Sequence, residues 1–142
     1  MSERSSGTVM FQGKGIVKGY FRGEALVTNK PISFLGGVDP STGIILEKNH
    51  DLEGATLAGR VLLMPHGKGS TVGSYVLYSL AKRKLAPGAI VTVKVDLMTL
   101  TGCVIGEIPL VDRVPEKALS TIRNGDIVEV DAFRGLIKVI SR

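Results

Sequence analysis

Polar and hydrophobic positions alternate along residues 15–34, where β-branched and aromatic side chains are separated by Lys, Arg and Glu. A period of two is typical of strands with one buried face, so this segment predicts one or two strands, with a turn at residues 29–31. Residues 58–65 and 107–112 instead contain short uninterrupted apolar runs, which are typical of strands buried on both faces. Residues 89–96 predict a further strand between them.

Two segments that follow these strands have a helical pattern. In residues 71–84 an apolar side chain recurs every four positions, which predicts an amphipathic helix whose apolar positions are Val72, Val76 and Leu80. Residues 97–106 predict a short helix that packs through its small side chains.

The chain ends with a third predicted helix and a hairpin. Residues 115–125 open with a proline and close with a glycine, an arrangement that favours a helix between them. Residues 126–141 alternate again around a turn at residues 133–135, which predicts two antiparallel strands.

The order of these elements predicts an α/β fold. Strands that alternate with helices favour a central, largely parallel sheet with flanking helices, and the remaining strands could form a β-rich second layer. Neither a repeat nor a linker divides the sequence, so we expect a single domain over residues 13–142, preceded by a flexible polar tail at residues 1–12.

Residues 35–54 are dense in Gly, Asp and Pro and predict a shaped loop around a short strand at residues 44–47. Within it, Gly37 and Asp39 are candidate substrate-binding residues. For Asp39 the alternative is that its side chain only holds a turn, the more common role of an aspartate in such a sequence.

The composition limits the classes of function that this protein can have. Hydrophobic residues make up 44% of the 142 positions and charged residues 22%, as in ordinary globular proteins. The sequence has neither an apolar run of the ~18 residues that a membrane span needs nor an apolar signal core, so we expect a cytoplasmic protein that does not bind membranes. A net charge of +5 favours anionic ligands, but the basic residues are scattered and Trp is absent, so we expect no nucleic-acid binding.

The sequence has a single cysteine, Cys103, and two histidines, His50 and His66. One thiol excludes an internal disulfide and a metal site built from several thiolates. We therefore expect no metal site in this chain, and Cys103 is interpreted as a small buried side chain. Any metal would have to come from a partner.

The strongest candidate for chemistry is the junction between the predicted strand at 58–65 and the helix that follows it. Backbone N–H groups at a helix start, together with the helix dipole, favour an anion. Lys68 adds a positive charge, Gly69 lets the backbone approach a ligand, and Ser70 or Thr71 would occupy the N-cap. The glycine spacing matches neither nucleotide-binding loops nor the nucleophile elbow. The junction therefore predicts an anion site, or, as the simpler alternative, only a capped helix start.

Other polar residues are weaker candidates. Glu24 could be a site carboxylate or a solvated strand residue. Asp96, Asp112 and Arg113 end predicted strands, where open α/β sheets place ligands.

Four segments, GEALV, GGVDPSTG, GKGSTVGSY and GEIPLVDR, together resemble the small subunit of the aconitase X family. The resemblance covers roughly residues 13–140, and the combination of the second and third segments is its most specific part. It implies a swivelling β/β/α domain like the mobile domain of aconitases.

The resemblance also implies a hydro-lyase that is active only as a heterodimer with a large subunit, which holds a [4Fe-4S] cluster. The implied reaction is the dehydration of (R)-5-phosphomevalonate, a small anionic hydroxy acid, to trans-anhydromevalonate 5-phosphate in isoprenoid biosynthesis. Ser70 falls on the family's proton acceptor, and Lys68, Gly69 and Thr71 beside it in the sequence are expected to bind the substrate. Other members of the family act on hydroxyproline, and a non-catalytic anion-binding module is a further alternative.

Overall fold

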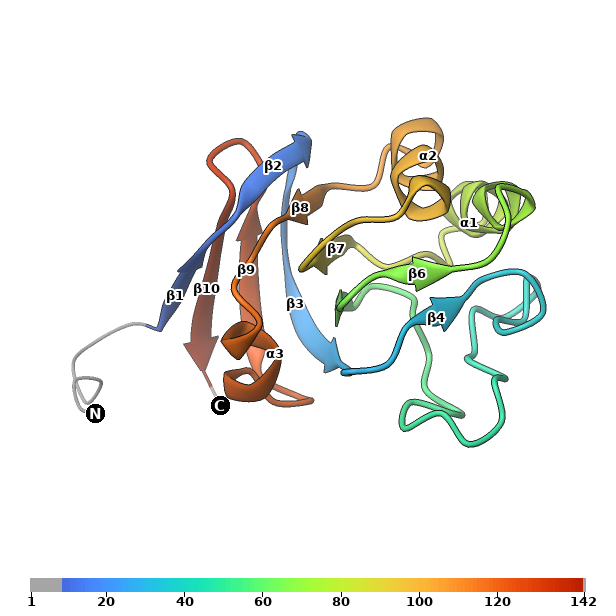
Figure 1. The fold of residues 1–142 in the computed structure, drawn as a ribbon, viewed down its shortest axis with the longest axis horizontal. Coiled ribbons are helices and arrows are strands. Elements are labelled where there is room, and N and C mark those ends of the chain that lie inside the picture. Colours follow the sequence, from blue (N-terminus) through green and yellow to red (C-terminus); the bar gives the residue numbers. More distant parts are fainter. Residues whose placement is uncertain (1–8, 142) are drawn as a thin grey trace.

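The computed structural model describes residues 9–141, and its elements are arranged around one large sheet (Figure 1). In chain order they are β1 (Met10–Gln12), β2 (Lys14–Val17), β3 (Tyr20–Val27), β4 (Ile32–Ser33), β5 (Val61–Met64), β6 (Gly67–Lys68), α1 (Val72–Lys82), β7 (Ala89–Thr92), α2 (Leu97–Gly106), β8 (Leu110–Asp112), α3 (Lys117–Thr121), β9 (Ile127–Asp131) and β10 (Leu136–Ser141).

The large sheet has eight strands in the order β1-β10-β9-β3-β5-β7-β8-β2, and β4 and β6 form a separate pair. The four central strands β3, β5, β7 and β8 are parallel, as the alternation of strands and helices predicted. The strands on either side of them pair antiparallel, and these supply the β-rich part of the fold. The two edge strands, β1 and β2, are consecutive in the chain on either side of Gly13, so the sheet curls until its edges meet in one extended segment (Figure 1).

Side chains of β5 alternate between two cores. Val61 and Leu63 join a cluster to which seven strands of the curled sheet and α3 contribute. Leu62 and Met64 point to the opposite face and join a second cluster beneath α1 and α2. The strand is therefore buried on both faces, which is why its sequence is an uninterrupted apolar run.

The N-terminal boundary differs from the sequence prediction. A flexible tail was expected over residues 1–12, but Met10–Gln12 form β1, so that expectation is wrong for these residues. The reason is that Phe11 is only 6% exposed in the core and lies opposite Ile137 of β10. Residues 1–8 lie outside the described part of the chain.

The buried face of α1 also differs from the prediction. Val72 was expected on the buried face but is 51% exposed, whereas Gly73 and Leu77 are buried together with Leu80. The helix is rotated because it packs closely on α2, where a Cβ added to Gly102 would lie 2.7 Å from the Leu77 side chain. The absence of a side chain at Gly102 thus leaves the room that Leu77 occupies between the two helices.

Two further elements are shorter than the patterns suggested. The strand expected at residues 44–47 is reduced to isolated bridges, in which Val38 pairs with Ile45 and Ile44 with Thr56. The third helix covers Lys117–Thr121 only, whereas the pattern extended over residues 115–125.

Closure of the sheet leads to a stability prediction at Gly15. A Cβ at this position would lie 1.8 Å from the backbone oxygen of Ala132, which cannot move without displacing the hairpin. We expect Gly15→Ala to lower the free energy of unfolding by about 1–3 kcal/mol in urea denaturation. Gly106→Ala is the matched control, because its added Cβ meets side chains at 3.1 Å or more at the end of α2. Equal stability of the two variants would contradict this account of the closure.

Candidate active site

The predicted strand-to-helix junction is a short strand followed by a glycine turn. Gly67–Lys68 form β6, which pairs in parallel with β4 so that Ser33 is the Cα partner of Lys68. The next residue, Gly69, has φ +110°, a conformation that side-chain-bearing residues rarely adopt. This glycine turns the chain from β6 toward the start of α1.

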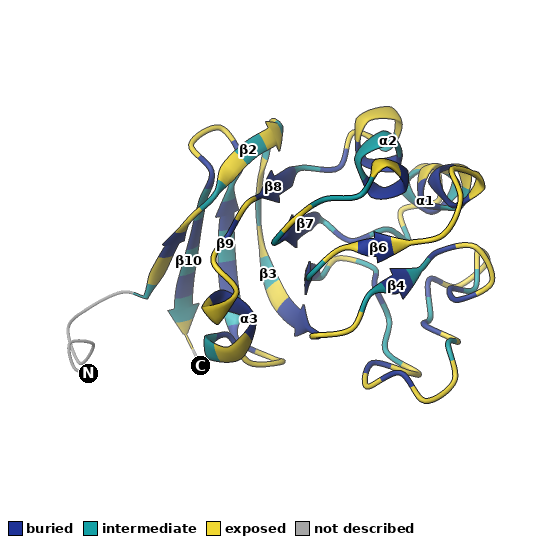
Figure 2. Cartoon of the chain, viewed as in Figure 1, coloured by how far each residue is buried: buried dark blue, intermediate teal, exposed yellow. Residues whose placement is uncertain are grey.

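Ser70 and Thr71 follow, and both are exposed. Figure 2 shows the segment between β6 and α1 in the colour of exposed residues. Thr71 occupies the N-cap position, one of the two residues predicted there, but its side chain makes no capping hydrogen bond. The Ser70 hydroxyl accepts a hydrogen bond of 3.3 Å from the backbone N–H of Val72. A serine oxygen is thus held at the positive end of an 11-residue helix and stays open to a ligand.

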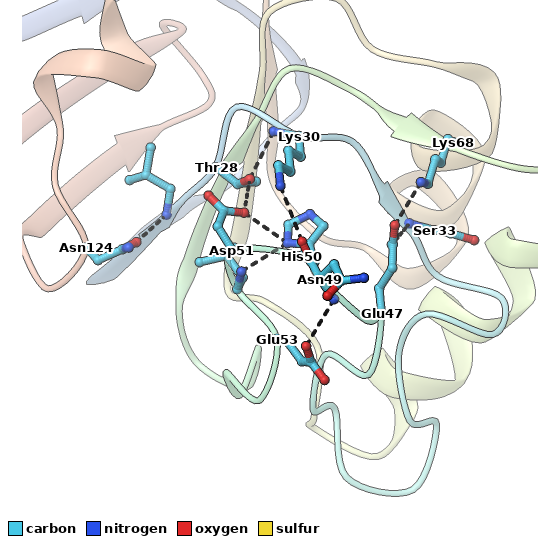
Figure 3. Close-up of polar contacts among 12 residues, drawn as sticks. Thr28, Lys30, Ser33, Glu47, Asn49, His50, Asp51, Glu53, Lys68 and Asn124 are labelled. Carbon is cyan, nitrogen blue, oxygen red and sulfur yellow. Dashed lines mark hydrogen bonds and ion pairs between the residues drawn. The ribbon is translucent and has the colours of Figure 1, made fainter.

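The ammonium group of Lys68 is paired with the carboxylate of Glu47 (Figure 3). The distance from Lys68 Nζ to Glu47 Oε2 is 2.8 Å, and Glu47 Oε1 accepts a 3.3 Å hydrogen bond from the backbone N–H of Ser33. One carboxylate therefore contacts both strands of the β4–β6 pair. Through this pair Glu47, which is distant from Lys68 in the sequence, becomes part of the junction.

Two opposing effects act on the pKa of Glu47. Burial by itself would raise the pKa, but the hydrogen bond and charge of Lys68 and the N–H of Ser33 lower it below its ordinary value. Glu47 is therefore a carboxylate at neutral pH, and the site holds a fixed pair of opposite charges.

The lowered pKa of Glu47 predicts a specific acid sensitivity. A group whose pKa is lower in the folded state stabilises the fold above its unfolded pKa, and this contribution is lost as the pH falls through the folded value. We expect the free energy of unfolding to decrease more steeply in the wild type than in Glu47→Gln between about pH 5 and about pH 3. Urea denaturation across that range measures the difference, and parallel curves for the two proteins would refute it.

Asp96 connects the junction to α2. Its Oδ1 accepts a 2.6 Å hydrogen bond from the backbone N–H of Gly67, and its Oδ2 accepts one of 3.1 Å from Thr99 at the first turn of α2. Gly67 has no room for a side chain, because an added Cβ would lie 2.4 Å from the Thr99 hydroxyl. Asp96 was a weak candidate for ligand binding, and the structure places it as the residue that fixes the junction.

The predicted substrate-binding residues fall into two groups. Lys68, Gly69 and Thr71 lie next to Ser70 in the junction. Gly37 is buried behind Glu47, where an added Cβ would lie 2.1 Å from the Ser33 carbonyl oxygen and 3.2 Å from Glu47 Oε1. A direct contact between Gly37 and a substrate stays a prediction.

Asp39 has the contacts of a turn residue. Its side chain accepts a 2.8 Å hydrogen bond from the N–H of Ser41, and its backbone N–H donates to Ile44. The turn alternative weighed for Asp39 therefore describes its observed contacts, and a role in binding substrate stays a prediction.

The remaining candidates lie apart from the junction or have structural partners. Glu24 is half-exposed and pairs with Arg60 at 3.4 Å. Asp112 is buried and accepts hydrogen bonds from Thr92 and Val95.

The single thiol and the acidic and imidazole groups do not form a metal centre in the described residues. Cys103 is buried, and this burial raises the pKa of its thiol, so it is poorly suited to bind iron as a thiolate. Within residues 9–141 the structure contains no group of three or more His, Cys, Asp or Glu side chains that could hold a metal ion. The helices of that same part of the chain are all too short or too polar to span a membrane.

Sequence reasoning did not identify Glu47 or Ser33 as parts of the site. Neither lies in a motif with a recognisable spacing to the junction. Their position depends on the parallel pairing of two very short strands, β4 and β6, which no periodicity in the sequence indicates.

Comparison with known proteins identifies the family to which the chain is similar. A model described as the aconitase X swivel domain matches residues 10–139. The phosphomevalonate dehydratase small subunit of Methanosarcina acetivorans is 45% identical over 132 residues, which cover 93% of this chain and 92% of the relative. The protein of the same name from Pyrococcus furiosus is 45% identical over 131 residues, covering 92% and 96%. A chain in the crystal structure of Thermococcus kodakaraensis aconitase X (holo-form) superposes with a TM-score of 0.88 at 44% identity, covering 94% of this chain and 99% of that one.

Proposed function

The chain belongs to the aconitase X swivel domain family, and from this premise we propose that it is the small subunit of a phosphomevalonate dehydratase, a hydro-lyase. The observation that carries the proposal is the identity of about 45% to relatives of that name, which extends over nearly the full length of both chains. The same family membership confirms the swivelling-domain fold expected from the sequence.

The proposed role of this chain is to supply the base. Dehydration of a β-hydroxy acid removes a proton from C2, next to the carboxylate, and releases the hydroxyl from C3. In the proposal Ser70 Oγ, as the alkoxide, accepts the C2 proton. The hydroxyl of serine is a very weak acid, so the alkoxide needs stabilisation, which the N–H of Val72 and the helix N-terminus offer.

Lys68 and the junction backbone are proposed to bind the negative charge of the substrate. Removal of a proton beside a carboxylate increases the negative charge on that group in the transition state. The ammonium group of Lys68, two residues before Ser70 in the chain, and the N-terminus of α1 are suited to stabilise this charge. The net charge of +5 supports an anionic substrate as well.

The second half of the site is assigned to a large subunit. The relatives' name, small subunit, implies such a partner. Exposed apolar side chains at the start of α1, Val72 and Tyr75, support it, as does exposed Leu35, whose backbone N–H lies opposite Gly73. We assign the [4Fe-4S] cluster to that partner, where it would supply a Lewis acid for the departing C3 hydroxyl. Cys103 of this chain does not fit the role of a ligand.

Two alternatives predict different results. A hydroxyproline dehydratase of the same family would share the base and the partner but act on a cyclic amino acid. A non-catalytic anion-binding module would need neither a cysteine-bearing partner nor Ser70.

The test of the proposal is reconstitution. We expect the chain to co-purify anaerobically with a cysteine-bearing large subunit when the two are co-expressed, and to form trans-anhydromevalonate 5-phosphate only in the complex. Each subunit assayed alone is the control. Anion binding without any dehydratase activity in the reconstituted complex would favour the non-catalytic module.

A further inference from the structure

We infer that Glu47 is a positioning residue that holds the Lys68 ammonium group in place for the anionic substrate. This inference rests on the proposed function, because it concerns the same site, and it adds a residue that the sequence pattern did not identify. The pair is drawn in Figure 3, where the carboxylate of Glu47 lies between the backbone of Ser33 and the end of the Lys68 side chain.

The first support is the way in which Glu47 contacts two adjacent strands. Its two carboxylate oxygens bind different partners, Oε2 at 2.8 Å from Lys68 Nζ and Oε1 at 3.3 Å from the N–H of Ser33. Ser33 and Lys68 are opposite residues in the parallel β4–β6 pair. The carboxylate therefore fixes the Lys68 side chain to the strand beside it.

The second support is that Glu47 is itself held by its own loop. Its backbone N–H donates to Gly37 at 3.2 Å, and its backbone oxygen accepts from the N–H of His50 at 3.3 Å. Gly37 leaves room for this arrangement, because a Cβ there would lie 3.2 Å from Glu47 Oε1. A carboxylate with a fixed backbone and a fixed second oxygen can orient a flexible partner.

The third support is the difference in exposure between the two side chains. The Glu47 side chain is 23% exposed and that of Lys68 is 48% exposed, so the carboxylate lies on the inner side and the ammonium group on the outer side. An ammonium group has three donors, and one contact with Glu47 leaves others for a ligand. The pair thus presents the ammonium group outward at a defined position on β6, two residues before Ser70 in the chain.

Because Glu47 already restrains the Lys68 side chain, that side chain loses less conformational entropy when the substrate binds. A free lysine side chain samples many rotamers, and this freedom is lost when the ammonium group binds an anion. The competing possibility is that Glu47 blocks Lys68 and is displaced by the substrate. The two possibilities predict opposite changes in KM when Glu47 loses its charge.

The test is a double-mutant cycle in the complex with the large subunit, assayed on (R)-5-phosphomevalonate. We expect Glu47→Gln to raise KM about tenfold with a smaller change in kcat, and Lys68→Met to lower kcat/KM by on the order of a hundredfold. The double variant should be no worse than Lys68→Met alone, because Glu47 acts through Lys68. Glu53→Gln is the matched control, since Glu53 belongs to the same loop and binds the N–H of Asn49 instead.

Three kinetic results would overturn the inference. A lower KM in Glu47→Gln would show that the carboxylate competes with the substrate. Additive effects of the two substitutions would show that Glu47 does not act through Lys68. A loss in Glu53→Gln equal to that in Glu47→Gln would assign the effect to the loop as a whole.

A measurement on the full chain without substrate separates this inference from the proposed function. We expect the NMR order parameter of the Lys68 ε-carbon to be high in the wild type and to decrease in Glu47→Gln, while Glu53→Gln leaves it unchanged. If the complex does not act on phosphomevalonate, the proposed function fails, and the order parameter still decides the inference. A mobile Lys68 in the wild type would refute the inference even if the proposed function holds.

Discussion

Turnover by the assembled enzyme is expected to fall by about a hundredfold to ten-thousandfold when Ser70 is replaced by alanine, since a general base contributes about 10²–10⁴ to the rate. The substitution removes the hydroxyl that is proposed to take the C2 proton. It removes little else, because Ser70 is exposed and its side chain accepts one hydrogen bond of 3.3 Å from Val72. Folding and assembly with the large subunit should therefore be unchanged.

The control for Ser70→Ala is a serine-to-alanine substitution at an exposed position outside the junction. Ser120→Ala serves this purpose, because the Ser120 hydroxyl donates to Lys117 within α3 and is exposed. Steady-state rates of both variants in the complex, together with their elution as heterodimers, distinguish chemistry from assembly. Near-normal turnover by Ser70→Ala would end the assignment of this residue as the base.

The second large effect is expected at Asp96, which holds the junction through hydrogen bonds to Gly67 and Thr99. Asp96 is the N-cap residue of α2, so Asp96→Ala removes the acceptor for the N–H of Gly67 and the capping acceptor for the backbone N–H of Thr99. The loss of a cap and of a charged hydrogen bond should lower the free energy of unfolding by about 2 kcal/mol. Activity should fall on the order of a hundredfold, because a small displacement of the junction misaligns Ser70.

Two further variants show whether a displaced junction causes the loss of activity expected in Asp96→Ala. Asp96→Asn keeps an oxygen acceptor and should retain most of the stability. Asp131→Ala removes an acceptor for two backbone N–H groups in the β9–β10 turn, remote from β6 in Figure 1. Urea denaturation and steady-state assays of the complex provide both readouts. If Asp131→Ala lost as much activity as Asp96→Ala, general destabilisation would explain the effect.

Elements with strong periodicity could be predicted from the sequence, and elements that depend on tertiary contacts could not. The apolar run of β5 and the small-residue helix α2 were identified because burial on both faces and helical packing appear directly in their residues. β1 was missed because a three-residue strand is too short to show a period, although Phe11 gives it a buried side chain. The prediction of the buried face of α1 was partly wrong, because that face depends on how α1 packs against Gly102 of another helix.

The candidate site likewise contains residues that the sequence indicates and residues that only tertiary contacts bring to it. Lys68, Gly69, Ser70 and Thr71 are consecutive, so one segment and the physics of helix starts were sufficient to find them. Glu47 joins them only through the pairing of β4 with β6, two strands of two residues each. Such a contact between distant segments is visible in the fold and not in the spacing of the sequence.

A side-by-side substrate assay decides whether this chain forms half of a phosphomevalonate dehydratase site. The complex with its large subunit, prepared anaerobically, is supplied in parallel with (R)-5-phosphomevalonate and with hydroxyproline, and the products are identified. We predict trans-anhydromevalonate 5-phosphate from the first substrate and no product from the second. Turnover of hydroxyproline with none of phosphomevalonate would contradict the proposed function.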